Sequence, residues 1–177
     1  PRYQQFRAVH KTIERLKTGK TSKDKSGVIW HTQGSGKSLT MVFLTVKMRR
    51  DPELRDYKLV FLTDRTQLDS QLTSTFKHAQ DETIHHADSV KSLKELLESD
   101  SSGIITAMVQ KFQEKTGASK FPVLNESEKI IVLADEAHRT QYGTLGAAIN
   151  IALPNAPRIA FTGTPLIKSQ KTTNTFG

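Results

Sequence analysis

A glycine-rich turn between two apolar segments constrains the fold of this chain more than any other feature of its sequence. The stretch Gly27 to Phe43 reads GVIWHTQGSGKSLTMVF, in which an apolar run gives way to glycines, a lysine and a serine before apolar residues resume. Glycines let backbone N–H groups approach phosphate oxygens closely, and the helix that follows presents the positive end of its dipole to an anion. The stretch therefore predicts a strand, a phosphate-binding loop and a helix in succession.

The residues of this loop have distinct expected roles. Lys37 would reach the β- and γ-phosphates of a nucleotide, and the Ser38 hydroxyl would coordinate Mg²⁺. The general pattern, GxxxxGK followed by Ser or Thr, has glycine at its first position, where this chain has His31. A glycine-rich turn with an incidental lysine is the alternative that the loop alone leaves open. The predicted phosphate-binding residues are Gln33, Gly34, Ser35, Gly36, Lys37 and Ser38.

Short apolar runs alternate with segments of helical periodicity along the chain. Such runs suit parallel strands that are buried on both faces, and the alternation predicts an α/β fold with a mainly parallel sheet between two layers of helices. The predicted strands are Val28–Trp30, Leu59–Leu62, Ile104–Val109, Ile130–Ala134 and Ile159–Phe161. Helices are expected at residues 3–17, 38–49, 68–76, 90–97 and 145–152, with polar segments at 18–27 and 113–129.

One of these apolar runs ends in two acids. The segment Lys129 to Gly143 reads KIIVLADEAHRTQYG, so Asp135 lies at the carboxyl end of the predicted strand and could hold Mg²⁺. Glu136 is placed to orient and deprotonate an attacking water. His138 could contact the γ-phosphate region or link this site to the Thr-Gly-Thr-Pro turn; capping or packing at a helix start is an alternative of equal weight.

Composition narrows the classes of function. The chain of 177 residues has 26 Lys and Arg against 18 Asp and Glu, a formal charge of +8, which favours a polyanionic partner such as nucleic acid. Cysteine is absent, which excludes disulfides, Cys-ligated zinc and thiol catalysis. No apolar run is long enough to span a bilayer, so no membrane partner is expected.

The motifs GSGKS, DEAH and Thr162-Gly163-Thr164-Pro165 occur in the order of motifs I, II and III of superfamily 2 helicases. Together with DRTQLDSQL and AFTGTPL, they most resemble the motor subunit of Type I restriction enzymes, in which a histidine at the position of His31 is ordinary. The resemblance implies that residues 1–177 form the first RecA-like P-loop NTPase domain of a larger protein. It also implies ATP and Mg²⁺ as cofactors and translocation along double-stranded DNA.

The resemblance also assigns roles outside the loop. Gln5 would read the adenine edge, although Gln4 or a merely solvent-facing glutamine remains an alternative. Arg65, in a segment resembling motif Ia, would contact a DNA phosphate. Gln110 and Lys111 would face the DNA strand, whereas Ala107 and Met108 stand where threonines are expected, which puts hydroxyl contacts from those positions in doubt. The residues expected to couple the ATP and DNA sites are His138, Thr162, Gly163 and Thr164.

Further partners follow only from the resemblance. A second RecA-like domain with an arginine finger and a nuclease domain are expected in the same parent chain, together with separate methylation and specificity subunits in the cytoplasm of a bacterium or archaeon. Without the finger, the 177-residue chain alone is expected to hydrolyse little ATP. The alternatives are a Type III restriction subunit or repair helicase, a small-molecule kinase, and a non-catalytic nucleotide-dependent DNA-binding module.

Overall fold

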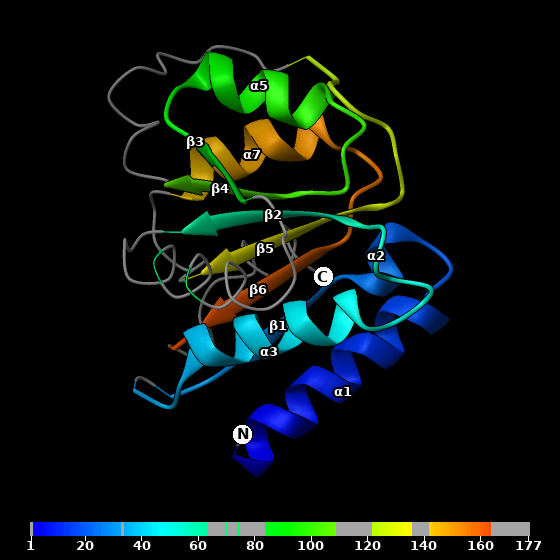
Figure 1. The fold of residues 1–177 in the computed structure, drawn as a ribbon, viewed down its shortest axis with the longest axis vertical. Coiled ribbons are helices and arrows are strands. Elements are labelled where there is room, and N and C mark those ends of the chain that lie inside the picture. Colours follow the sequence, from blue (N-terminus) through cyan, green and yellow to red (C-terminus); the bar gives the residue numbers. More distant parts are fainter. Residues whose placement is uncertain are drawn as a thin grey trace.

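A parallel β-sheet is the centre of the structure, a computed structural model that describes residues 2–32, 34–63, 70, 74, 84–108, 122–135 and 142–163 (not the side chains of 142–145). The strands of this part lie in the order β1-β6-β5-β2-β4-β3, and every neighbouring pair is parallel (Figure 1). The strands are β1 Gly27–Trp30, β2 Lys58–Thr63, β3 Ile84–Ala87, β4 Ile104–Met108, β5 Ile130–Asp135 and β6 Arg158–Thr162. The helices are α1 Tyr3–Thr18, α2 Ser22–Lys25, α3 Lys37–Arg49, α5 Val90–Glu98 and α7 Tyr142–Ala152.

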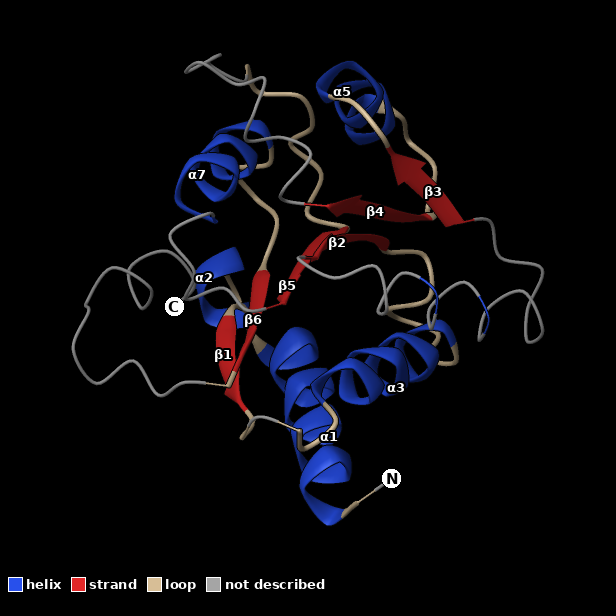
Figure 2. Ribbon diagram, turned by 90° about the vertical axis from the view of Figure 1, so that its left-hand side faces the viewer, coloured by secondary structure: helices blue, strands red, loops and turns tan. Residues whose placement is uncertain are grey.

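Helices cover the two faces of the sheet as separate layers. Figure 2 shows α1 and α3 on one side of the strands, with α5 and α7 on the other. Alternate residues of each strand point to opposite faces. In β2, Leu59 and Phe61 therefore pack with α1 and α3, and Val60 and Leu62 pack with α5 and α7. The three-layer α/β architecture predicted from the sequence is confirmed.

The central strands match their predicted burial, but the first strand does not. All six residues of β2 and of β5 are buried. The expectation of two buried faces is wrong for β1, because β1 lies at one edge of the sheet beyond the cover of α5 and α7. Its Val28 and Trp30 side chains are 45% and 57% exposed. The strand β3 was not predicted. The short helix α2 was not predicted either, because it lies within the segment 18–27 that was expected to be a polar loop.

Two cations, the buried Lys58 and the partly buried Arg158, secure the amino-terminal ends of their strands. Lys58, at the start of β2, donates from Nζ to the carbonyl oxygens of Leu96 (2.8 Å) and Leu97 (3.3 Å) at the end of α5. Arg158, at the start of β6, donates from Nη2 to the Leu153 carbonyl that follows α7, at 3.0 Å. Cations at helix C-termini satisfy carbonyls that lack intrahelical partners. These hydrogen bonds fix the C-termini of α5 and α7 at the amino-terminal ends of the strands, opposite to the phosphate loop.

Candidate functional site

The phosphate loop and Asp135 both lie at the carboxyl-terminal ends of the parallel strands. The loop follows β1, Asp135 ends β5, and β6 lies between these two strands. The strand register aligns Ile29 and Asp135 on either side of Phe161. Crevices outside the carboxyl ends of parallel strands are the usual ligand sites of open α/β sheets. The structure therefore brings together the loop and the first of the two predicted acids.

The loop has the backbone conformation that its glycines predict. Gly34 and Gly36 have φ angles of 78° and 89°, a left-handed region that residues with a Cβ rarely adopt. A Cβ added at Gly36 would lie 2.5 Å from Nε2 of Gln5, so a side chain at this position would displace the Gln5 carboxamide from the loop. Helix α3 begins at Lys37, and its N-cap residue, Gly36, supplies no side-chain cap. Gly36 therefore places no side chain between the first turn of α3 and an anion.

His31, at the non-glycine position of the pattern, lies beneath the loop. Its side chain is buried, with Nδ1 at 3.1 Å from Oγ of Ser35 and Nε2 at 3.5 Å from Oγ1 of Thr40. Burial, and to a smaller extent the nearby Lys37 ammonium, lower the pKa of His31 below its ordinary value. The imidazole is therefore neutral at pH 7.

Gln5 contacts the loop from helix α1. It is 4% exposed, its Nε2 donates to the Gly36 carbonyl at 3.2 Å, and its Oε1 accepts from the Arg2 amide at 2.9 Å. Gln4 is exposed. The structure therefore places Gln5, and not Gln4, beside the loop. A pocket of about 430 Å³ opens there, lined by Arg2, Gln5, Gly34, Ser35, Gly36, Leu39 and Phe43.

Two buried oxygen-bearing side chains end neighbouring strands on the face covered by α3. Asp135 is 3% exposed, and strand alternation places its carboxylate on the same face as Leu133 and Phe161, which pack with α3. Thr63 ends β2 on the same face, one residue beyond the aligned pair Leu62 and Ala134. Among the residues that the structure describes, its buried Oγ1 has no hydrogen-bond partner. A buried hydroxyl of this kind is costly unless a water or ligand satisfies it.

The oxygen ligands at the carboxyl ends of the strands fit Mg²⁺. Mg²⁺ prefers oxygen ligands, keeps several waters and takes one or two protein carboxylates together with substrate phosphates. Ser38 in the first turn of α3 and Asp135 at the end of β5 are donors of this kind. Within the described residues, no group of three or more His, Cys, Asp or Glu could hold a metal by itself. The donor set therefore fits a metal shared with a bound phosphate.

Several predicted site residues lie outside the described part of the chain. Thr162 and Gly163 are described at the end of β6, where the Thr162 carbonyl accepts from the His31 amide at 2.9 Å and the Gly163 carbonyl accepts from Trp30 Nε1 at 3.3 Å. The residues that are not described, and whose roles remain predictions, are Gln33, Arg65, Gln110, Lys111, Glu136, His138 and Thr164.

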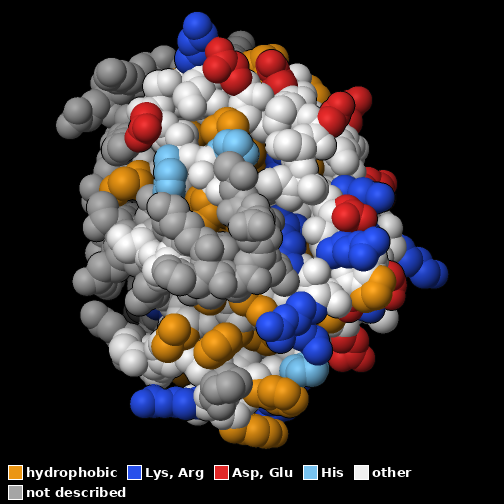
Figure 3. Space-filling view, in the orientation of Figure 1, with side chains coloured by type: hydrophobic (Ala, Val, Ile, Leu, Met, Phe, Trp, Pro, Cys, Tyr) orange, Lys and Arg blue, Asp and Glu red, His pale blue; other side chains and the backbone are white. Residues whose placement is uncertain are grey.

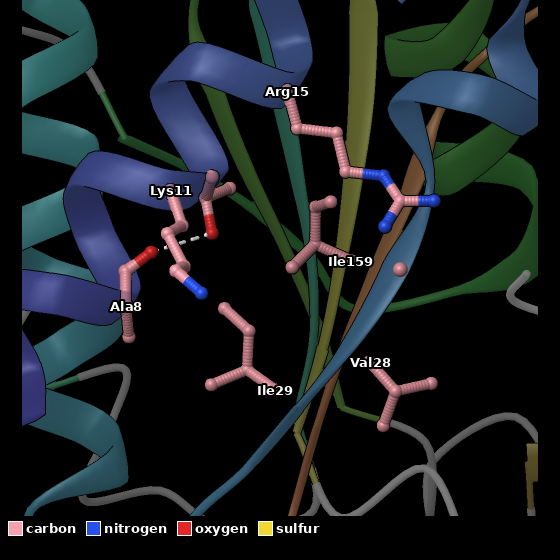
Figure 4. A pocket seen from close by; sticks show the side chains of 8 residues that line it. Ala8, Lys11, Arg15, Val28, Ile29 and Ile159 are labelled. Carbon is pink, nitrogen blue, oxygen red and sulfur yellow. Dashed lines mark hydrogen bonds between the residues drawn. The ribbon is translucent and has the colours of Figure 1, made fainter.

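Positive charge gathers in the first segment of the chain. Residues 2–32 contain eight Lys or Arg and two Asp or Glu. Figure 3 shows Lys and Arg side chains mainly in the middle and lower part of one face, whereas the upper part, over α5, carries mainly acidic side chains. A second pocket, of about 280 Å³, lies between α1 and β1, where Lys11 and Arg15 extend from α1 (Figure 4). It shares no residue with the phosphate loop. Of the described helices, none could cross a membrane.

Comparison with known proteins agrees with this arrangement. The family model described as SWI2/SNF2 ATPase matches residues 4–177. A putative type I restriction enzyme MjaIXP endonuclease subunit of Methanocaldococcus jannaschii is 42% identical over 99% of this chain and 17% of its own length. The type I restriction enzyme HindI endonuclease subunit of Haemophilus influenzae is 38% identical over 99% of this chain and 18% of its own. The chain thus spans less than a fifth of these relatives.

Solved structures share the fold at low sequence identity. The Sulfolobus solfataricus SWI2/SNF2 ATPase core in complex with double-stranded DNA has a TM-score of 0.64 and 18% identity, covering 99% of this chain and 35% of that one. A nuclease-deletion mutant of the Type ISP restriction-modification enzyme LlaGI, in complex with a DNA substrate mimic, has a TM-score of 0.55 and 17% identity, covering 93% of this chain and 17% of that one. The likenesses confirm the predicted RecA-like α/β fold.

Proposed function

This chain belongs to the SWI2/SNF2 ATPase family, and from that premise we propose that it is the ATP-binding domain of a motor that moves along double-stranded DNA. One observation carries the proposal: the loop Gly34–Gly36, the start of α3 and Asp135 all lie at the carboxyl-terminal ends of the parallel strands. A site of this kind offers backbone amides and a helix N-terminus to phosphates, and a carboxylate to the metal that the phosphates bind.

Each residue of the site would have its own role in the binding and hydrolysis of Mg·ATP. Lys37 would contact the β- and γ-phosphates, and Ser38 and Asp135 would hold Mg²⁺. Bound Mg²⁺ would neutralise charge on the phosphate oxygens during phosphoryl transfer. Glu136, directly after β5, would orient the attacking water and accept its proton.

The pocket beside Gln5 would receive the nucleoside part of ATP. Leu39 and Phe43 give this pocket an apolar wall, and Leu39 is 47% exposed. Each end of the Gln5 carboxamide makes one protein contact, which leaves one N–H of Nε2 and one lone pair of Oε1 for a base. A carboxamide can pair with the donor and the acceptor of adenine together, so we propose that Gln5 contributes the preference for ATP.

The parent protein would be the motor subunit of a Type I restriction enzyme. The identities of 42% and 38% to endonuclease subunits of such enzymes support this proposal. A second RecA-like domain would supply an arginine finger, and a nuclease domain would cleave the DNA. Methylation and specificity subunits would choose the DNA site in the cytoplasm of the host.

Hydrolysis of ATP by the full-length protein should depend on DNA. With Mg·ATP, linear duplex DNA should stimulate phosphate release, and the protein should displace a third strand annealed to that duplex. Asp135→Asn should abolish both activities because an amide is a poor ligand for Mg²⁺. Asp56→Asn, an exposed change ahead of β2, is the control and should behave as wild type. Hydrolysis that is the same with and without DNA would reject the motor and favour a kinase or another hydrolase.

Binding to DNA should be steep in salt and indifferent to sequence, because phosphate contacts carry no sequence information. Arg65→Ala and Lys111→Ala should each reduce the log–log slope of affinity against salt by about 0.9. The control is Lys91→Ala, a lysine of α5 whose side chain is 88% exposed and which pairs with Glu95 at 3.9 Å. Fluorescence anisotropy with duplexes of unrelated sequence measures the slopes. A strong preference for one duplex, or unchanged slopes in both variants, would contradict the assignment.

A further inference from the structure

His31 is a buried polar side chain to which the proposed chemistry gives no role. It stands where the general phosphate-loop pattern has glycine, and it is 6% exposed. Its backbone amide donates to the Thr162 carbonyl at 2.9 Å, which continues the pairing of β1 with β6. The backbone of His31 is thus held by the sheet, and its side chain is directed under the loop that follows.

The hydrogen-bond partners define which nitrogen of His31 carries the proton. Oγ of Ser35 lies 2.5 Å from the Thr32 carbonyl and donates its only hydrogen there, so it accepts from His31 Nδ1 at 3.1 Å. Oγ1 of Thr40 donates to the Gly36 carbonyl at 3.0 Å and lies 3.5 Å from Nε2. The short contact at Nδ1 and the long one at Nε2 together fit a neutral ring protonated on Nδ1.

The contacts of the ring lie on both sides of the loop. Ser35 stands between Gly34 and Gly36, two residues whose backbones have the most conformations to lose on ordering. Thr40 belongs to the first turns of α3, and the Gly36 carbonyl accepts from both the amide and the hydroxyl of Thr40, each at 3.0 Å. The ring thus lies between the tip of the loop and the start of the helix, where it can limit the motion of the turn.

We propose that His31 is a positioning residue that holds the turn Gly34–Gly36 in its phosphate-binding shape by hydrogen-bonding Ser35 and contacting Thr40. The inference rests on the proposed function, because it assumes that the turn receives a phosphate. His31 does not touch the nucleotide itself. A glycine at this position could not make either contact, so this chain holds its loop by a side chain that the general pattern lacks.

Three variants of the full-length protein test this role. His31→Phe keeps the ring and removes both nitrogens. His31→Asn places its side-chain N–H where Nδ1 stands and so keeps the donor to Ser35. Ser35→Ala removes the partner.

His31→Phe should raise the KM for Mg·ATP by about 3- to 10-fold, the range expected for one lost hydrogen bond, with little change in kcat. His31→Asn should restore most of the affinity. The double variant of His31→Phe with Ser35→Ala should lose less affinity than the sum of the two single variants, because both changes remove the His31–Ser35 contact and only Ser35→Ala also removes the hydrogen bond to Thr32. Equal KM values for wild type and His31→Phe, or additive effects in the double variant, would overturn the inference.

A second measurement needs no nucleotide. Hydrogen exchange followed by mass spectrometry should show faster exchange of the amides at residues 34–37 in His31→Phe than in His31→Asn or wild type, with α5 as the unchanged internal reference. Equal exchange in all three proteins overturns the role of His31, whatever the affinity for ATP. If wild type binds no ATP but the exchange difference is present, the tie between His31 and the loop is supported and the proposed function fails.

Discussion

Lys37→Ala should weaken binding of Mg·ATP by about 100-fold, because truncating one partner of a hydrogen-bonded charge pair costs about 2–5 kcal/mol and about 1.4 kcal/mol is tenfold in affinity. Lys37 begins α3 directly after Gly36. Its ammonium would supply the one positively charged side chain of the loop segment Gly34–Ser38. The loop amides and the helix dipole would remain in the variant, so residual weak binding is compatible with the assignment. Isothermal titration of the full-length protein measures the loss.

Lys47→Ala is a matched control for this experiment. Lys47 lies on the same helix, is exposed and does not line the pocket beside Gln5. Its removal changes the net charge equally and should leave the affinity for Mg·ATP unchanged. An equal loss in both variants would point to a general effect of charge, and an unchanged affinity in Lys37→Ala would remove the loop from the nucleotide site.

Lys37→Ala has a second expected consequence at His31. The Lys37 ammonium is the smaller of the two causes that lower the pKa of His31, and burial is the larger. The pKa of His31 should therefore rise in the variant and stay below its ordinary value. Titration of the His31 ring followed by NMR would report this shift independently of any nucleotide.

Strong local patterns predicted most of the fold. The central strands are continuous apolar runs, and parallel strands covered on both faces have this composition. Strand β3 was missed because it is only four residues long and carries His85 and His86 in its middle. Helix α2 was missed because its sequence, with two lysines and no apolar residue, is typical of a polar loop. The sequence does contain one signal of a helix start, since Thr21 and Asp24 form a reciprocal cap.

The exposure of β1 could not be read from its residues. Val28, Ile29 and Trp30 form an apolar run like those of the central strands. Whether such a run is central or at an edge depends on the order of strands, which local composition does not determine. Only the topology shows that β1 is next to β6 alone among the described strands.

The candidate site was predictable where a role depends on neighbours in sequence. The turn at Gly34 and Gly36 follows from glycine content, and the position of Asp135 follows from the end of an apolar strand. The contacts of His31 with Thr40, and of Gln5 with Gly36, join residues 9 and 31 positions apart, respectively. Contacts of this kind depend on how α1 and α3 pack on the sheet. The same holds for Thr63, whose place beside the end of β5 comes from strand pairing.

Glu136→Gln in the full-length protein should lower DNA-stimulated turnover of ATP by about 100- to 10,000-fold, the usual contribution of a general base. Glu136 follows directly on Asp135, the last residue of β5. The amide of glutamine has nearly the shape of the carboxylate and can still orient a water through a hydrogen bond. It cannot accept the proton of that water, so the hydrolysis step slows while binding of the nucleotide is retained.

Binding and turnover should therefore separate in this variant. Mg·ATP should bind to Glu136→Gln about as tightly as to wild type, because Lys37, Ser38 and Asp135 are unchanged, whereas Asp135→Asn should lose binding together with turnover. Glu98→Gln, at the exposed end of α5, is the control for loss of a carboxylate and should keep full turnover. Isothermal titration and steady-state phosphate release distinguish these outcomes. If Glu136→Gln keeps more than about a tenth of wild-type turnover, its effect is too small for a general base and another group activates the water.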